Sequence, residues 1–540
     1  MKKWCFAFLA LVGLTTCAQT EVWAYLRARD TLFEPDFSFR ESVLTYTGTD
    51  IKLKTILEKY TISTFKKTYR TATKEHLKKT FFIRASDPQI VQELLEQTPH
   101  LFEFGEIIAP EDHHIFEPND YGLTSTVGEN LGLQARLDYY DFIDLPKAWY
   151  YTTGHPDVII GISDGLIDTT DVDFQNKTRV IRRSGKARGH GDSVAATAAA
   201  KGNNGAGFVG VCSDCSIYGT TYGNFKTLSQ LVELSNLGVQ VINCSWGSKT
   251  YYQTAQDAIN EMFENGTVIV AAAHNKPWQE TNGEVFYYPA SYDNVISVSS
   301  VMHRYEKPLD NLLFEKEKNS KPYVENIRGY VGRTAGFTND DTTTDPYIYP
   351  ISTKILNTAV DILGPAVGLL RYGEITKGAG IDYSLYSQTS GVTPMVSGTV
   401  GLMFSLYPCL PVTMVDPILK VTATNIDSIP ANKRFAGKYG AGSLNAGRAV
   451  KLTHDLFATD GEAVIQNQHF TRWVFPLQTL SRKLTFKNQT FTDAAQLTVT
   501  AKHKIILEPG TSLRPNEEGK SHFYIDSDLE KQCDLRLRAK

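Results

Sequence analysis

The sequence lacks a strong excess of either charge, because 55 basic and 59 acidic side chains leave a formal net charge of −4 over 540 residues. No basic surplus indicates a nucleic-acid partner, and no acidic tail indicates a polycationic one. No apolar run after the N-terminus reaches the about 18 residues that mark a membrane-spanning helix, so we expect no membrane span. The hydrophobic content of 42% and charged content of 21% are typical of globular proteins, and the length predicts several domains.

The N-terminus has the layout of a secretory signal. Lys2 and Lys3 precede an apolar run from Trp4 to Leu14, and small residues follow at Thr16-Cys17-Ala18. We interpret residues 1–18 as a signal peptide that sends the chain out of the cytoplasm, to a secreted or cell-surface location. A second interpretation makes Leu14-Thr15-Thr16-Cys17 a lipobox, with Cys17 as a lipoprotein anchor.

Cysteine is scarce, with seven residues in the whole chain. The five that follow the predicted signal are an odd number, so at least one thiol is free if all pairing is internal; they are Cys212, Cys215, Cys244, Cys409 and Cys533. Cys212-Ser-Asp-Cys215 favours a small surface-loop disulfide, with a metal site or a redox site as the alternatives. Cys244 lies in an apolar run and is expected to be a buried, inert thiol.

The pattern along the chain predicts three folded segments after the signal. Residues 19–118 read as strand, helix and strand, which favours a ferredoxin-like α+β domain. Residues 119–458 alternate short β-branched runs with helices, which predicts an α/β domain with a doubly wound, mostly parallel sheet and a polar surface insertion at about 305–350. Residues 459–540 alternate polar and apolar residues between turns, which predicts a small all-β domain. We see no internal repeat.

One catalytic motif in the α/β segment is misleading. Gly161-Ile-Ser-Asp-Gly165 matches G-x-S-x-G, the nucleophile elbow of α/β-hydrolases, which must continue directly into a helix. Residues 166–173 are instead β-branched and rich in aspartate, which makes a poor helix start. We therefore do not assign the nucleophile to Ser163.

Four separated segments carry a more consistent chemistry: 157–168 (DVIIGISDGLID), 189–200 (GHGDSVAATAAA), 268–275 (VIVAAAHN) and 388–398 (QTSGVTPMVSG). Together they supply a carboxylate at a strand end, an imidazole and a hydroxyl at two helix starts, and an amide after a strand. A serine nucleophile needs these four parts for acyl transfer. Taken alone, each side chain could equally be a helix cap or a turn residue; only their combination points to catalysis.

In these segments, and in 241–247 (VINCSWG), 288–298 and 439–446, the sequence resembles the subtilase family of subtilisin-like serine proteases. The resemblance implies a secreted endopeptidase with a catalytic triad of Asp164, His190 and Ser390. It also implies that Asn275 supplies the oxyanion hole. The Asp, His, Ser order along the chain differs from that of the α/β-hydrolases.

The resemblance further implies a substrate site for polypeptides, which would pair as an added strand with the backbone at Ser245, Trp246 and Gly247. Ala273 and His274 complete the predicted substrate-binding residues. Trp246 is expected to floor or narrow an apolar subsite, with core packing as the alternative.

Two further features follow from the same resemblance. Asp173 and Asn204, with carbonyls of the loop 202–208, match a family calcium site, and hard oxygen ligands of this kind suit Ca²⁺. No catalytic cofactor is expected. Residues 19–118 resemble a propeptide that assists folding and inhibits the enzyme until it is cleaved off near 109–125.

The sequence departs from the family pattern near the predicted site. Gln388 and His274 replace glycines at positions where the backbone can require a positive φ or a close approach to substrate. An active zymogen-derived endopeptidase and a peptide-binding scaffold with weak or no catalysis therefore remain as two hypotheses.

Overall fold

The computed structural model describes residues 21–539, with gaps at 41–42, 70–71, 73, 127–129, 187–188, 277–283, 308, 310–311, 316–320, 325, 345, 353 and 376–380. The predicted signal peptide at 1–18, including Cys17, lies outside the described residues. The chain divides after His114 into two compact units, each with its own hydrophobic core. Within the described ranges, no helix is long and apolar enough to cross a membrane.

The N-terminal unit is an antiparallel sheet with two main helices. Its strands are β1 (Val22–Ala28), β4 (Ile62–Lys67), β5 (Thr80–Ala85) and β6 (Phe102–Ile107), in the order β4-β5-β1-β6. The helices are α1 (Ile51–Leu57), α2 (Glu75–Lys78) and α3 (Gln89–Gln97), and a hairpin joins β2 (Phe37–Arg40) to β3 (Val43–Tyr46). The order β1, α1, β4, β5, α3, β6 with this pairing is the ferredoxin-like arrangement that the sequence predicts.

The second unit is built on a seven-stranded sheet in the order β17-β12-β11-β10-β7-β9-β8, in which every neighbouring pair is parallel. Its strands are β7 (Ile159–Ser163), β8 (Thr178–Val180), β9 (Ser216–Thr220), β10 (Val241–Cys244), β11 (Val268–Ala272), β12 (Val295–Val301) and β17 (Ile362–Pro365). The predicted doubly wound fold class is confirmed.

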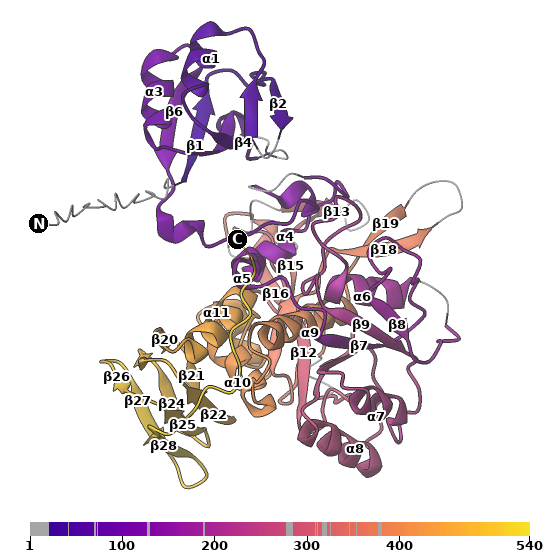
Figure 1. Cartoon of the computed structure of the whole chain (residues 1–540). Coiled ribbons are helices and arrows are strands. Elements are labelled where there is room, and N and C mark those ends of the chain that lie inside the picture. The colour runs from indigo at the N-terminus through magenta and orange to yellow at the C-terminus, as the bar shows by residue number, and fades with distance from the viewer. Residues whose placement is uncertain are drawn as a thin grey trace, which may run out of the picture. The chain divides into compact units, whose positions relative to one another are not determined.

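Helices cover both faces of this sheet. Helices α6 (His190–Ala199) and α9 (Thr389–Leu406) pack on one face, whereas α7 (Ser229–Asn236) and α8 (Gln253–Glu264) pack on the other (Figure 1). A parallel sheet covered on both faces needs strands that are apolar throughout, and β10, β11 and β12 are buried at every residue. The remaining α-helices of this unit are α4 (Asp138–Phe142), α5 (Leu145–Tyr151), α10 (Val412–Thr422) and α11 (Ala446–Phe457).

The polar segment at 305–350 carries antiparallel hairpins. β13 (Leu312–Glu315) pairs with β14 (Lys321–Val324), and β15 (Gly332–Phe337) pairs with β16 (Pro346–Ser352). Val324, Ile327 and Phe337 form a small buried cluster, so the insertion has apolar packing of its own. A third hairpin, β18 (Leu369–Ile375) and β19 (Ile381–Tyr386), leads directly into α9.

The C-terminal segment is a three-coil parallel β-solenoid. Its nine strands form three small sheets, β20-β23-β26, β21-β24-β27 and β22-β25-β28, with every pair parallel. The strands are β20 (Glu462–Gln466), β21 (His469–Phe470), β22 (Val474–Thr479), β23 (Lys483–Lys487), β24 (Thr490–Asp493), β25 (Gln496–Ala501), β26 (Ile505–Leu507), β27 (Ser512–Pro515) and β28 (Lys520–Ile525).

The solenoid overturns the expectation that the chain has no internal repeat. Ala463, Leu484 and Ile505 stack in register at a spacing of 21 residues, and on the other two faces the coils are 21 to 24 residues apart. The same corner of each coil has a positive φ, at Asn467 (64°), Asn488 (46°) and Gly510 (89°). Asn488 Nδ2 donates a hydrogen bond of 3.0 Å to Asn467 Oδ1 across the coils. The repeat consists of a turn conformation and inward-facing apolar residues of different sizes, so sequence identity between coils is low.

The solenoid shares one core with the α/β part of this unit. Leu456 of α11 and Ile465 and Phe470 of the first coil belong to the same buried cluster. After β28 the chain returns to the α/β part, where Arg536 N donates to Leu406 O (2.8 Å) and Arg538 N donates to Tyr151 O (2.7 Å).

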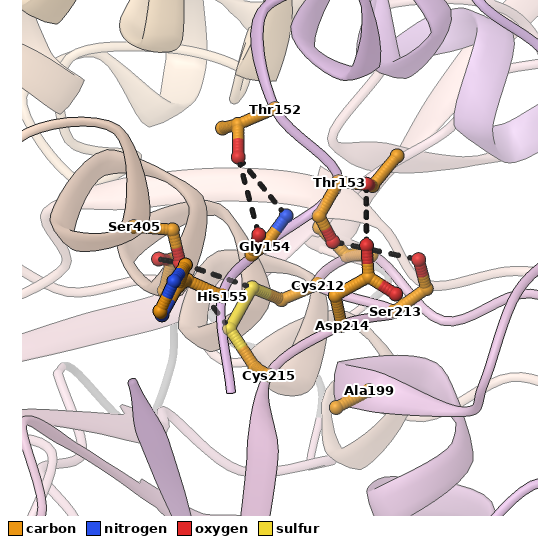
Figure 2. The surroundings of a disulfide bond; sticks show 12 residues. Thr152, Thr153, Gly154, His155, Ala199, Cys212, Ser213, Asp214, Cys215 and Ser405 are labelled. Carbon is orange, nitrogen blue, oxygen red and sulfur yellow. Dashed lines mark hydrogen bonds between the residues drawn. A yellow bond between two sulfur atoms is a disulfide. The ribbon is translucent and has the colours of Figure 1, made fainter. Parts of the chain in front are cut away.

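Two disulfides follow from this arrangement. Cys212 and Cys215 are bonded beside Ser405, as Figure 2 shows, which confirms the predicted disulfide. Its predicted surface location is wrong, because both cysteines are fully buried in the core. Gly154, at φ 118°, lets the chain pass close by, because a Cβ there would lie 2.8 Å from Cys212 Sγ. The second disulfide joins Cys409, just after α9, to Cys533 in the returning tail. Among the described cysteines this leaves Cys244 free and buried, as expected.

We predict that the Cys409–Cys533 bridge contributes substantially to stability, because its partners are 124 residues apart in sequence. Closing a loop of that length lowers the entropy of the unfolded chain, and removing such a bridge typically costs about 2–4 kcal/mol. Replacing both cysteines by alanine should lower the free energy of unfolding by this amount in guanidinium denaturation. Cys244→Ala is the control, since it removes a buried sulfur without opening a loop; equal losses in both variants would contradict the prediction.

Candidate active site

The carboxyl ends of three neighbouring strands bring predicted site residues to one edge of the sheet. β7, β10 and β11 end at Ser163, Cys244 and Ala272, and Asp164, Ser245 and the segment 273–275 follow directly. Because these strands are parallel neighbours, the residues after them lie side by side. Clefts at this edge are the usual ligand sites of open parallel sheets.

Asp164 and His190 are in direct contact. His190 opens α6, and its Nδ1 lies 2.7 Å from Asp164 Oδ1. The Asp164 side chain is fully buried, whereas the His190 side chain is 31% exposed, so the imidazole is accessible from the side away from the carboxylate. The sharp approach of α6 requires Gly191, since a Cβ there would lie 2.6 Å from the carbonyl oxygen of Gly165.

Tyr222 is a site residue that the sequence analysis missed. Its hydroxyl donates a hydrogen bond of 2.9 Å to Asp164 Oδ1 and lies 3.5 Å from His190 Nδ1. Burial, together with the charge of Asp164, raises the pKa of the Tyr222 phenol, so it stays a donor. A signal was present, because Tyr222 follows β9, the strand beside β7, by two residues.

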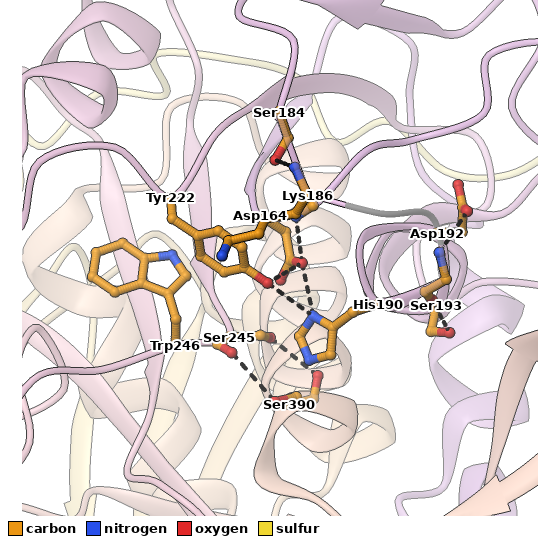
Figure 3. A network of polar contacts seen from close by, with 12 residues as sticks. Asp164, Ser184, Lys186, His190, Asp192, Ser193, Tyr222, Ser245, Trp246 and Ser390 are labelled. Atoms are coloured by element: carbon orange, nitrogen blue, oxygen red, sulfur yellow. Dashed lines mark hydrogen bonds and ion pairs between the residues drawn. The ribbon is translucent and has the colours of Figure 1, made fainter.

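Ser390 lies in the first turn of α9. Its hydroxyl donates to the Ser245 carbonyl oxygen (3.2 Å), and the Ser245 hydroxyl donates to the Ser390 carbonyl oxygen (3.0 Å). Figure 3 shows Ser390 beneath the imidazole of His190, with Asp164 and Tyr222 at the opposite side of the ring. The geometry thus gathers a carboxylate, an imidazole and a hydroxyl from β7, α6 and α9.

Asn275 is anchored to the same helix start. Its Oδ1 accepts hydrogen bonds from the Thr389 backbone N–H (2.8 Å) and hydroxyl (3.1 Å). These bonds fix the orientation of the amide, so that Nδ2 is the end left to donate elsewhere. Ser390 is the second residue of α9, and a backbone N–H at this position has no partner within the helix.

The two glycine replacements behave differently. His274 has a φ of 94°, so the backbone at this position does require the conformation that favours glycine. Gln388 is extended, with a φ of −146°, and is compatible with any side chain. The departure from the family pattern therefore constrains the backbone at His274 and not at Gln388.

The predicted substrate-binding residues lie along the same edge. Trp246 is 9% exposed, and its Nε1 donates a hydrogen bond to Ser163 O (2.9 Å). Its ring packs against that of Phe225, with the ring centroids 4.9 Å apart. Ala273 is buried in a separate cluster, and His274 stacks on Tyr287. Gly247 also contacts Tyr287, since a Cβ on Gly247 would lie 3.3 Å from that of Tyr287.

The predicted calcium ligands are adjacent, but they bind each other. Asn204 Nδ2 donates to Asp173 Oδ1 (2.9 Å), and Asn204 Oδ1 accepts from Ala206 N (3.0 Å). Asp173 Oδ2 accepts from Phe208 N (3.3 Å). Within the described ranges no three acidic, histidine or cysteine side chains are grouped as a metal site. These hydrogen bonds pair the Asp173 and Asn204 side chains with each other and with the loop backbone, and calcium at this loop stays a prediction.

The parallel α/β fold and the cluster of carboxylate, imidazole and hydroxyl define the chain as a candidate serine hydrolase, distinct from the α/β-hydrolases. The model of the subtilase family matches residues 155–442, which is more than half of the chain, and the protein belongs to that family. The predicted family is therefore confirmed, and with it the serine-protease class.

Individual relatives match parts of the chain. A thermophilic serine proteinase of Bacillus sp. (strain AK1) is 31% identical over 170 residues, which cover 28% of this chain and 41% of the relative. Subtilisin DY of Bacillus licheniformis is 25% identical over 307 residues, 54% of this chain and 91% of the relative. The structure of fervidolysin from Fervidobacterium pennivorans is similar at 17% identity and a TM-score of 0.42, covering 79% of this chain and 61% of that one.

We predict that Asp173 makes stability depend on pH. Burial, with Asp171 and Asp120 nearby, raises its pKa from 3.8 to about 7. A carboxyl whose pKa is raised on folding stabilises the protein below its unfolded pKa, and this stability is lost as the pH rises through the folded value. The free energy of unfolding should therefore fall between about pH 4 and pH 7, by up to about 4 kcal/mol.

Chemical denaturation of the wild type and of Asp173→Asn across this range tests the prediction. The variant should lack this part of the pH dependence, and an unchanged profile would contradict the prediction. The same pair of proteins tests calcium binding. At a pH above 7, a calcium ion held by Asp173 would raise the thermal unfolding midpoint of the wild type, and excess EDTA would lower it again. Asp173→Asn would show neither change.

Proposed function

We propose that this protein is a secreted serine endopeptidase that hydrolyses polypeptides through an acyl-enzyme on Ser390, and that it is made as a zymogen. The observation that carries the proposal is the 2.7 Å hydrogen bond between Asp164 and His190, at the sheet edge where α9 presents Ser390. Membership of the subtilase family supports the same reaction class.

In this mechanism the two ring nitrogens of His190 have separate roles. Asp164 accepts from Nδ1–H, which fixes the tautomer and leaves Nε2 free to take the Ser390 proton. The serine oxygen attacks the substrate carbonyl, and His190 then gives the proton to the leaving amine. Asp164 stabilises the imidazolium that forms between these steps. Tyr222 is a positioning residue in this scheme, because its hydroxyl donates a hydrogen bond to Asp164 Oδ1.

Attack by Ser390 converts the substrate carbonyl into an oxyanion that needs hydrogen-bond donors. We assign this role to Asn275 Nδ2 and the backbone N–H of Ser390. The Thr389 bonds to Asn275 Oδ1 support the assignment, since they hold the oxygen end of the amide and leave Nδ2 as the end that can donate. Removing one such donor typically lowers kcat by about 10²–10³.

The Ser390–Ser245 hydrogen bonds bear on how substrate enters. The Ser390 hydroxyl currently donates to the Ser245 carbonyl, so it must turn toward His190 Nε2 for proton transfer. Catalytic hydrogen bonds are often loose without substrate and tighten in the complex. A substrate strand that pairs with residues 245–247 would place its carbonyl beside this hydroxyl.

The N-terminal unit is assigned the role of propeptide. It folds around its own core, as a removable folding aid and inhibitor would. Within the predicted cleavage region of 109–125, Glu117 and Tyr121 are buried, and the Glu117 carboxylate accepts from Ser125 (2.8 Å). The exposed positions lie before Glu117, so we place the cut there. Residues 1–18 are assigned as the secretion signal.

The active-site hypothesis predicts that a fluorophosphonate probe labels the processed protein at one serine. Ser390→Ala should abolish labelling, and His190→Ala should lower its rate, because the base that activates the hydroxyl is gone. Ser229→Ala is the matched control, since Ser229 is also at a helix start, but it is an exposed residue of α7 outside the candidate site. Folded, processed protein that is not labelled would instead support a peptide-binding scaffold.

The zymogen hypothesis predicts that processing depends on the same serine. Intact-mass measurements should find that the wild type has lost the N-terminal unit. The Ser390→Ala chain should keep this unit and lose at most the signal peptide. Adding a trace of active wild type to the Ser390→Ala chain should release the same unit. A Ser390→Ala chain that is still processed when purified alone would show that another protease makes the cut.

A further inference from the structure

The space that receives the substrate side chain before the cleaved bond is set by two chain segments. The reacting carbonyl must lie between the Ser390 hydroxyl and Asn275, because these are the nucleophile and the oxyanion donor of the proposed mechanism. Residues 245–247 and 273–275 leave the neighbouring parallel strands β10 and β11 at this edge. The side chain on the residue that supplies the carbonyl therefore enters the gap between these segments.

Two aromatic rings of the protein itself lie across that gap. The His274 and Tyr287 rings are stacked with centroids 3.9 Å apart and planes at 6°. Tyr287 also lies against Gly247, since a Cβ on Gly247 would lie 3.3 Å from Tyr287 Cβ and 3.6 Å from Cδ1. The stack thus extends from one wall, at His274, to the other, at Gly247.

The stack is held rigidly. The residue after Tyr287 forms an antiparallel bridge, in which Ser248 N donates to Tyr288 O (2.8 Å) and Tyr288 N donates to Ser248 O (2.7 Å). Tyr287 is 4% exposed and belongs to a buried cluster with Ala273 and Ile355. The ring cannot swing aside without breaking this packing, so the gap stays filled when substrate arrives.

The stack favours uncharged rings. Burial, with Lys276 and Lys249 nearby, lowers the pKa of His274, which favours the neutral form of its ring. Lys249 Nζ lies 5.9 Å from the Tyr287 ring centroid. The His274 backbone has a φ of 94°, a conformation that favours glycine over residues with a side chain. In this conformation the His274 ring stacks on Tyr287.

We propose that the His274–Tyr287 stack closes the substrate pocket next to the scissile bond, so that the enzyme cleaves after glycine, alanine or serine and excludes aromatic and long aliphatic side chains. This inference rests on the proposed function, since it needs Ser390 to be the nucleophile. It makes Tyr287 and His274 the specificity-determining residues of this chain.

Digestion of a proteome-derived peptide library, with the cleaved bonds identified by mass spectrometry, tests the proposal. For the mature wild type we expect glycine, alanine and serine before the cut to be enriched over leucine, phenylalanine and tyrosine by at least about tenfold, the scale at which a pocket discriminates by size. Tyr287→Gly should open the pocket and raise the proportion of cuts after phenylalanine and leucine by a similar factor.

Two further variants keep the test decisive. Tyr287→Phe keeps the ring and should keep the exclusion of large side chains. His274→Gly removes half of the stack at a position where the backbone favours glycine, so it should fold and should widen the preference even if Tyr287→Gly does not fold.

The outcomes separate the two proposals. A wild type that is labelled at Ser390 and cuts mainly after large, or after acidic, residues would overturn the closed pocket while the serine mechanism stands. A wild type that neither labels nor cuts would overturn the proposed function, and the pocket assignment with it. Cuts after small residues that persist unchanged in both Tyr287→Gly and His274→Gly would assign the preference to other residues.

Discussion

The structure depends on the parallel alignment of β7, β9, β10 and β11, because parallel strands bring their carboxyl ends to one edge. Asp164, Tyr222, Ser245 and Asn275 come from segments up to 111 residues apart in sequence, and each lies within three residues of a strand end. The sheet is buried on both faces, so the polar groups that follow its strands are held at a rigid, apolar boundary. Such a boundary lets the buried Asp164 carboxylate orient His190 without competition from water.

The same constraint explains why the second half of the site comes from helices. α6 and α9 pack on the same face of the sheet and begin near its carboxyl edge, which brings His190 and Ser390 over Asp164. Helix starts also supply free backbone N–H donors, which suits the stabilisation of an oxyanion. Sheet edge and helix starts together hold the side chains that the proposed acyl transfer uses, and Tyr222 adds a further hydrogen bond to Asp164.

The C-terminal segment shows a different relation between sequence and fold. The three coils of the solenoid agree in backbone conformation at the corner formed by Asn467, Asn488 and Gly510, while the residues that stack inside differ in size. Each coil is stable through its neighbours, as in other repeat folds, and the first coil packs on α11. The Cys409–Cys533 bridge attaches the tail that follows the solenoid to the segment just after α9.

The sequence by itself predicted the α/β class and the ferredoxin-like order of the N-terminal unit from local hydrophobic patterns, and it favoured the Cys212–Cys215 disulfide from a short spacing. The family followed from the resemblance of separated motif segments to the subtilases. It also marked Asp164, His190, Ser390 and Asn275 as candidates, whose catalytic roles remain proposals. Only the tertiary structure decided that Tyr222 touches Asp164, that Tyr287 stacks on His274 against Gly247, and that the last segment is a solenoid. The Tyr222 and Tyr287 contacts join residues whose separation in sequence carries no periodic signal, and they arise only when neighbouring strands are packed side by side. The coils of the solenoid are 21 to 24 residues apart, and they share a backbone conformation more than a residue pattern.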